Sequence, residues 1–148
     1  MSNANVRWGW LRFMYGYTIA GAGGFGLGML FTPDIMKSLF AMPDRDPVIF
    51  GIAGSVYASF GILSILGLRS PLKYVPVLVL QLSYKSIWFL TVFLPLLLAG
   101  KIQFYGILFA VTFATYIVGD LIAIPFSYVF GRQSDQIDPI RTLGPVLK

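Results

Sequence analysis

Long apolar runs separated by short charged segments make up most of this sequence. Four such runs cover about residues 8–31, 48–68, 75–98 and 102–125. A helix needs about 20 residues to cross the hydrocarbon core of a bilayer, so each run is long enough to do so. Strands of a transmembrane β-barrel would instead alternate between apolar and polar residues. The pattern therefore predicts an all-α integral membrane protein, a bundle of four transmembrane helices.

Proline and capping residues indicate where several of these helices begin and end. Asp46 followed by Pro47 predicts the start of the second span, because Asp caps helix N-termini and Pro is favoured at the first helical position. Pro95 and Pro125 lie late in the third and fourth runs, where a missing N–H group predicts a kink or an early end. Residues 34–42 predict a short amphipathic helix or turn at the level of the lipid headgroups, and a plain connecting loop is the alternative.

The start of the chain has two features of a secretory signal. Arg7 and Arg12 precede an apolar stretch, and the small residues at positions 20–22 resemble a cleavage site. The apolar run nevertheless continues to Phe31, as a membrane span should. We therefore expect one transmembrane domain over residues 1–132, followed by a polar cytoplasmic tail over residues 133–148.

Composition agrees with a membrane protein. Hydrophobic residues make up 57% of the 148 residues and charged residues 11%, and the mean hydropathy is +0.77. These values exclude an ordinary water-soluble globular domain.

The distribution of cations predicts the orientation. If all four runs cross, seven cations share one side of the membrane: Arg7, Arg12, Arg69, Lys73, Arg132, Arg141 and Lys148. The opposite side has only Lys37, Arg45 and Lys101. The positive-inside rule then places both termini in the cytoplasm. A basic cytoplasmic rim favours anionic lipid headgroups as partners, whereas cations scattered over three segments do not indicate nucleic-acid binding.

Missing residue types exclude much chemistry. The chain has no His, Cys or Glu, and all six of its acidic residues are Asp. We therefore expect no metal site, no haem or iron–sulfur cofactor, no Cys nucleophile and no His general base.

Small residues recur along one face of the first run. Gly16, Ala20, Gly24 and Gly28 are four residues apart, which favours close approach of another helix backbone. The partner is either another helix of the same bundle or a second protein chain. The same run contains the pattern G-x-G-x-x-G at residues 21–26, but no strand precedes it, so a dinucleotide site is not expected.

Two charged residues lie within the predicted spans. Lys85 follows Lys73 by 12 residues and Asp120 precedes Arg132 by 12 residues, so both are expected about 18 Å from the same boundary. An unpaired charge at this depth costs about 2.5 to 3.5 kcal/mol on insertion scales. We therefore predict an ion pair between Lys85 and Asp120, either direct or bridged by water.

Other polar and aromatic residues extend this cluster. Helical spacing and depth place five of them near the charged pair: Gln81, Tyr84, Trp88, Tyr116 and Tyr57. Such a cluster either fixes the register of the third and fourth helices or surrounds a small binding cavity.

Several of these features together resemble a known family. The length, the four predicted spans, the lysine in the third span and a Gly-Asp-x-x-x-x-Pro segment at Gly119, Asp120 and Pro125 resemble the small bacterial DoxX-like membrane proteins. The resemblance extends over most of the chain. It implies a four-helix protein of the bacterial inner membrane, and it transfers no catalytic or binding residue.

Three classes of function remain open. The abundant small-residue faces favour a non-enzymatic bundle that oligomerises or serves as an accessory subunit of a membrane complex. The alternative is a small transporter or ligand-binding membrane protein that uses the Lys85 and Asp120 cluster. An enzyme acting on lipid would lack the usual nucleophile and metal ligands.

Overall fold

The computed structural model describes residues 6–131, and throughout this range the chain forms helices joined by short connections. The predicted all-α class is therefore confirmed. The predicted tail at 133–148 lies outside the described residues. In chain order, the elements are α1 (Trp8–Thr18), η1 (Ile19–Gly23), α2 (Gly24–Phe31), α3 (Pro33–Leu39), α4 (Pro47–Arg69), α5 (Val75–Trp88), η2 (Phe89–Phe93), α6 (Leu94–Leu98), α7 (Phe104–Ala123) and α8 (Phe126–Val129).

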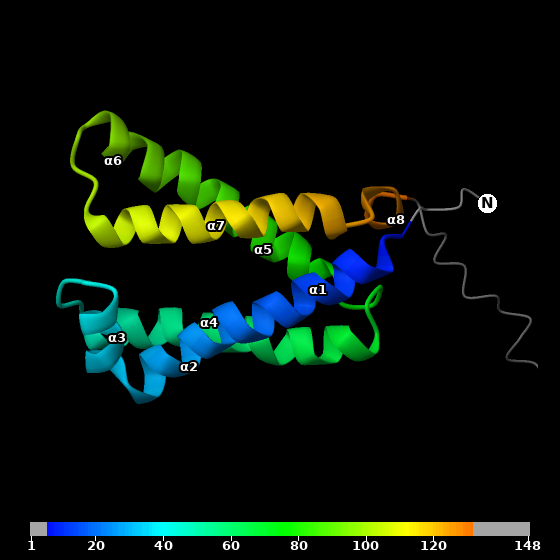
Figure 1. The fold of residues 1–148 in the computed structure, drawn as a ribbon, viewed down its shortest axis with the longest axis horizontal. Coiled ribbons are helices and arrows are strands. Elements are labelled where there is room, and N and C mark those ends of the chain that lie inside the picture. Colours follow the sequence, from blue (N-terminus) through cyan, green and yellow to red (C-terminus); the bar gives the residue numbers. More distant parts are fainter. Residues whose placement is uncertain (1–5, 132–148) are drawn as a thin grey trace, which may run out of the picture.

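The helices form four segments that run along the long axis of the molecule in alternating directions (Figure 1), and each segment is called a pass below. The first pass is α1, η1 and α2, the second is α4, the third is α5, η2 and α6, and the fourth is α7. The first pass packs on α4 along its length, and α1 also packs on α7. At the end where α3 lies, α2 and α4 diverge from α6 and α7 (Figure 1).

Within residues 6–131, three helices are long and apolar enough to cross a membrane. They are Pro47–Arg69, Val75–Leu98 and Phe104–Ala123. The first predicted span is also helical from Trp8 to Phe31, but its glycines and tyrosines make it less apolar than the other three. Three apolar helices support a membrane protein.

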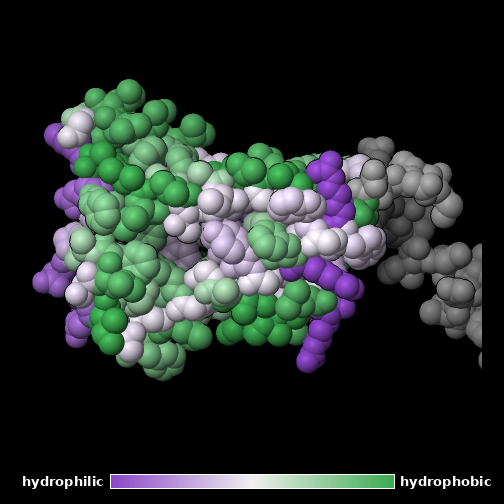
Figure 2. Space-filling view, viewed as in Figure 1, coloured by the Kyte–Doolittle hydropathy of each residue, from purple (hydrophilic) through white to green (hydrophobic). Residues whose placement is uncertain are grey.

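The surface has the polarity expected of such a protein. Figure 2 shows hydrophilic residues gathered toward the two ends of the long axis, with apolar residues between them. Large side chains such as Ile62, Leu90 and Val111 are each more than half exposed. A soluble monomer rarely leaves so much contiguous apolar surface in water, whereas lipid would cover it.

The helix ends follow the local chemistry of the sequence. The Asp46 carboxylate accepts hydrogen bonds from the N–H groups of Val48 and Ile49, at 2.8 and 3.1 Å, and so caps α4 as predicted. α7 ends at Ala123, because the residue before Pro125 adopts an extended conformation. The π-helical turn η2 ends two residues before Pro95, whose missing N–H group disturbs the hydrogen-bond ladder.

The short segment between the first two passes is helical, as the amphipathic pattern predicts. α3 exposes Ile35 and Leu39 along much of their surfaces. Met36 and Phe40, by contrast, are half-buried. Both residues line the cavity of the candidate site, and the Met36 side chain also lies against Gly28.

The closest contact between helices is the crossing of the first pass and α4. A Cβ atom added to Gly26 would meet backbone atoms of Gly54 and Ala58. A Cβ atom added to Gly23 would lie 3.0 Å from the Cα atom of Gly61. Glycine at these positions lets the two backbones touch, which is how helices pack where lipid supplies no hydrophobic driving force.

The small residues at this contact are not the ones predicted from their spacing of four residues along the first run. A Cβ atom added to Gly16 or to Gly24 would have no neighbour within 4 Å among the described residues, and Ala20 is exposed. Gly28 lies against Met36 of α3. The predicted ridge therefore does not pack the bundle, apart from Gly28. Its role in contacting a second chain stays a prediction.

Candidate functional site

A buried polar cluster joins α1, α5 and α7. The Gln81 amide donates hydrogen bonds to the Asp120 carboxylate (Nε2 to Oδ2, 3.2 Å) and to the Thr18 hydroxyl (3.2 Å). The structure buries all three side chains completely. Gln81 thus satisfies one carboxylate oxygen, while Asp120 Oδ1 has no hydrogen-bond partner among the described residues. Thr18 was not predicted to belong to this cluster.

The direct ion pair predicted between Lys85 and Asp120 is wrong. Among the described residues, the one ion pair is between Lys37 and Asp44, at 3.3 Å. The Lys85 ammonium has no hydrogen-bond partner among these residues. The antiparallel register places Asp120 opposite Gln81 and places Tyr116, one helical turn earlier, opposite Lys85. Our depth count assumed a continuous helix from Asp120 to Arg132, but α7 ends at Ala123.

Aromatic rings surround the Lys85 ammonium in place of a carboxylate. Its Nζ atom lies 4.0 Å from the ring centroid of Tyr116, 4.6 Å from that of Tyr84 and 5.3 Å from that of Phe113. Lys85 itself is 1% exposed. Ring faces attract a cation, and this attraction is stronger in a desolvated site than in water. The rings therefore hold the charge in place without supplying an acceptor atom.

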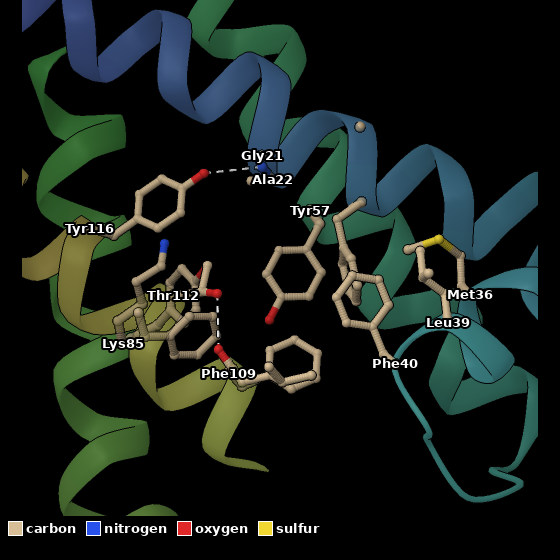
Figure 3. A pocket seen from close by; sticks show the side chains of 15 residues that line it. Gly21, Ala22, Met36, Leu39, Phe40, Tyr57, Lys85, Phe109, Thr112 and Tyr116 are labelled. Atoms are coloured by element: carbon tan, nitrogen blue, oxygen red, sulfur yellow. Dashed lines mark hydrogen bonds between the residues drawn. The ribbon is translucent and has the colours of Figure 1, made fainter. Parts of the chain in front are cut away.

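Tyr116 also reshapes the first pass. Its hydroxyl donates a hydrogen bond to the Tyr17 carbonyl (3.1 Å) and accepts one from the Ala22 N–H group (3.2 Å), as the contact between Tyr116 and Ala22 in Figure 3 shows. A side chain inserted into the backbone ladder of a helix locally widens it. The π-helical turn η1, Ile19–Gly23, lies at this point.

Gly21 makes that insertion sterically feasible. A Cβ atom added to Gly21 would overlap the Tyr116 hydroxyl. Turns of π-helix within α-helices occur frequently at functional sites. In this protein, the turn lies beside a cavity.

The cavity lies between the first pass and α4 on one side and α5 and α7 on the other. Its volume is about 340 Å³. Figure 3 shows Lys85 and Tyr116 at one side of the open space, Tyr57 across it, and Met36 and Leu39 farther away on α3. The lining residues are Gly21, Ala22, Gly24, Phe25, Met36, Leu39, Phe40, Tyr57, Tyr84, Lys85, Leu108, Phe109, Thr112, Phe113 and Tyr116.

The predicted site residues fall into two groups. Tyr57, Tyr84, Lys85 and Tyr116 line the cavity together. Gln81 and Asp120 belong to the adjoining buried cluster, and neither lines the cavity. Trp88 does not line the cavity, but it packs against the lining residue Phe113, with their ring centroids 5.1 Å apart.

Sequence reasoning missed most of the apolar lining. Phe109, Thr112, Phe113 and Tyr116 are spaced three and four residues apart, and this spacing on α7 is a signal for one shared helix face. By contrast, Phe25, Met36 and Phe40 come together through the tertiary turn at α3, which leaves no periodic signal.

Comparison with known proteins adds no family to this description. No protein-family model, no curated protein and no solved structure matches the chain. The residues of the site therefore carry the functional argument by themselves.

The cavity combines an apolar wall with a small number of unsatisfied polar atoms. Among the described residues, the Lys85 ammonium and the Tyr84 hydroxyl are buried and have no hydrogen-bond partner, and both residues line the cavity. Buried polar groups in proteins are nearly always paired, so such exceptions need an explanation. A ligand that supplies the acceptors would satisfy both groups.

Proposed function

We propose that this protein binds a small amphipathic molecule inside the membrane, as a transporter or ligand-binding membrane protein. The observation that carries the proposal is the cavity of about 340 Å³ with the unpartnered Lys85 ammonium at its wall. Small-molecule sites are concave and mostly apolar, with a few placed polar groups, and this cavity fits that description. An ionisable residue inside a membrane span is itself a default functional candidate.

The sequence analysis favoured a non-enzymatic bundle that oligomerises or serves as an accessory subunit. That hypothesis explains less of the geometry around Lys85. A charge used only to fix helix register would be expected to meet its counter-charge. Here Gln81 meets Asp120, and Lys85 faces the cavity. A homo-oligomer or a partner subunit that packs on the exposed residues Ala20 and Gly24 remains compatible with ligand binding.

We further propose that the first pass also crosses the membrane, giving four spans with both termini in the cytoplasm of a bacterial cell and the bundle in the inner membrane. The alternating direction of the four passes supports this topology, because it brings the start of α1, the end of α4 and the end of α7 to one end of the molecule (Figure 1). Anionic headgroups are the lipid partners expected beside that basic end.

Quenching of Trp88 fluorescence tests ligand binding. Changing Trp8 and Trp10 to Phe leaves Trp88 as the reporter, since the chain has three tryptophans. In nanodiscs of zwitterionic lipid, we expect at least one dodecyl amphiphile brominated at mid-chain to quench Trp88 saturably. The amphiphiles are bromododecanoate, bromododecanol and bromododecylammonium.

A matched pair of variants locates the binding. Thr112→Phe fills the cavity and should weaken saturable quenching about tenfold or more, because the ligand loses its space. Ala114→Phe adds the same ring at an exposed position of α7 outside the cavity, and it should leave quenching unchanged. Quenching that is linear in amphiphile for all three compounds, or that responds equally to the two variants, would contradict the proposal.

A further inference from the structure

Two neighbouring residues of the cavity lining carry hydrogen-bond donors. Tyr84 and Lys85 are neighbours on α5, and the Lys85 ammonium lies 4.6 Å from the Tyr84 ring centroid. Neither the ammonium nor the Tyr84 hydroxyl meets an acceptor among the described residues. The Lys85 ammonium only donates hydrogen bonds, so its missing partner must be an acceptor.

The charge presented to the cavity at the Lys85 end is positive. Among the described residues, Lys85 is the one charged residue in the cavity lining, whereas the buried Asp120 carboxylate lies outside the lining and accepts a hydrogen bond from Gln81. Three aromatic rings contact the ammonium by their faces and leave its hydrogen-bonding capacity unused. An anion in the cavity would supply both the counter-charge and the acceptors, and hydrogen bonds between charged partners are the strongest kind.

The opposite end of the cavity is apolar. Met36 and Leu39 of α3, and Phe40 just after it, line it there, on the far side of the open space from Lys85 (Figure 3). Aromatic side chains such as Phe25 and Phe109 form much of the wall between the two ends. A ligand that matches this arrangement has a charged head near Lys85 and a hydrocarbon tail that extends toward α3.

We infer that the ligand is a single-chain amphiphile with a carboxylate headgroup, an inference that rests on the proposed function. One carboxylate oxygen accepts from the Lys85 ammonium and the other accepts from the Tyr84 hydroxyl. A monoanion balances the single cation of the lining, whereas a phosphate head, with more charge and more acceptor oxygens, would leave several of them unpaired. The volume of about 340 Å³ lies near the lower limit for ligand pockets, which favours one chain over two.

The test compares headgroups on one chain length. In the nanodisc assay with Trp88 as reporter, mid-chain brominated dodecanoate should bind about tenfold more tightly than the matched alcohol, and the matched ammonium should not bind saturably. This comparison uses unmutated cavity residues, so it does not depend on the folding of a variant. Brominated dodecyl phosphate provides a fourth arm.

Variants of the two donors then assign the contact. Lys85→Met should remove the preference for carboxylate over alcohol, and Lys85→Arg should restore part of it. Tyr84→Phe should weaken carboxylate binding by a smaller factor, about threefold, because it removes a neutral donor. Alcohol binding serves as the internal control for an intact cavity in each variant.

The outcomes separate this inference from the proposed function. Equal saturable binding of carboxylate, alcohol and ammonium would overturn the carboxylate assignment and leave a ligand-binding cavity. Tighter binding of the phosphate than of the carboxylate would overturn it as well. Absence of saturable quenching by every compound would overturn the proposed function itself. Carboxylate preference that survives in Lys85→Met would show that Lys85 does not hold the headgroup.

Discussion

Tyr116 influences both the local backbone and the candidate site. Its hydroxyl bridges the Tyr17 carbonyl and the Ala22 N–H group, while its ring face contacts the Lys85 ammonium. The hydroxyl thus supports the π-helical turn η1 on one side of the cavity, and the ring positions a charge on the other. Gly21 leaves the space that the hydroxyl needs.

Removing that hydroxyl should destabilise the protein. Tyr116→Phe leaves the buried Ala22 N–H group and the partly buried Tyr17 carbonyl without this partner, so the free energy of unfolding should fall by about 1 to 3 kcal/mol. Unfolding in mixed detergent micelles, followed by circular dichroism, measures the change. Tyr74→Phe is the control, because the Tyr74 hydroxyl makes no hydrogen bond to a side chain or backbone group in the described part of the chain. A loss no larger than that of the control would show that the bridge does not contribute to stability.

Among the helical elements, the crossing of the first pass and α4 is held by backbone contact. Gly26 and Gly23 lie against Gly54, Ala58 and Gly61, at separations that leave no room for added side-chain atoms. Such an interface gains its stability from close packing, since lipid is as apolar as the side chains that would replace it. The crossing also supports one wall of the cavity, because Phe25 and Tyr57 lie within it.

A single methyl group at this crossing should therefore have a large effect. Gly26→Ala forces the two backbones apart, and overpacking of this kind costs about 1 to 3 kcal/mol in unfolding free energy. Gly16→Ala is the matched control in the same pass, because its added Cβ atom meets no described atom within 4 Å. Thermal unfolding in detergent compares the two variants. Equal stability of the two variants would disprove the close crossing.

The whole molecule has polar ends and an apolar middle (Figure 2). Its cavity is lined in part by α3, at the end where α2 and α4 diverge from α6 and α7 (Figure 1). The basic residues Arg12, Arg69 and Lys73 lie near one end, and Lys37, Arg45 and Lys101 lie near the other. This arrangement matches a protein whose long axis runs across the membrane. It places the α3 end of the cavity on the side opposite the cytoplasm in the topology that we propose.

Cysteine labelling in bacterial cells tests that topology. The chain has no cysteine, so a single introduced thiol reports one position. A membrane-impermeant maleimide should label Lys101→Cys in intact cells, and should label Arg7→Cys and Ser70→Cys only after permeabilisation. Labelling of Arg7→Cys in intact cells together with Lys101→Cys would show that the first pass does not cross. Complete reversal of the pattern would show that the orientation is wrong while the four spans are right.

Local sequence alone determined the helical class, most helix boundaries and four of the residues that line the cavity. Asp46 and Pro125 act through hydrogen bonds and steric contacts with their own chain neighbours, so their effects can be read without knowing the fold. Unbroken apolar runs likewise predict helices wherever they lie in the molecule. Lys85, Tyr84, Tyr116 and Tyr57 were all predicted to cluster, and they line one cavity.

Tertiary structure decided which faces meet and which charges pair. The first pass has glycines on several faces, and the π-helical turn η1 adds a residue that rotates everything after it by about 100°. Fourfold spacing therefore predicted Gly16, Ala20 and Gly24, whereas Gly23 and Gly26 make the contact. The antiparallel register of α5 and α7 places Asp120 within hydrogen-bond distance of Gln81, whereas Lys85 lines the cavity. Register depends on how two helices pack against each other, and the sequence of either helix alone does not contain that information.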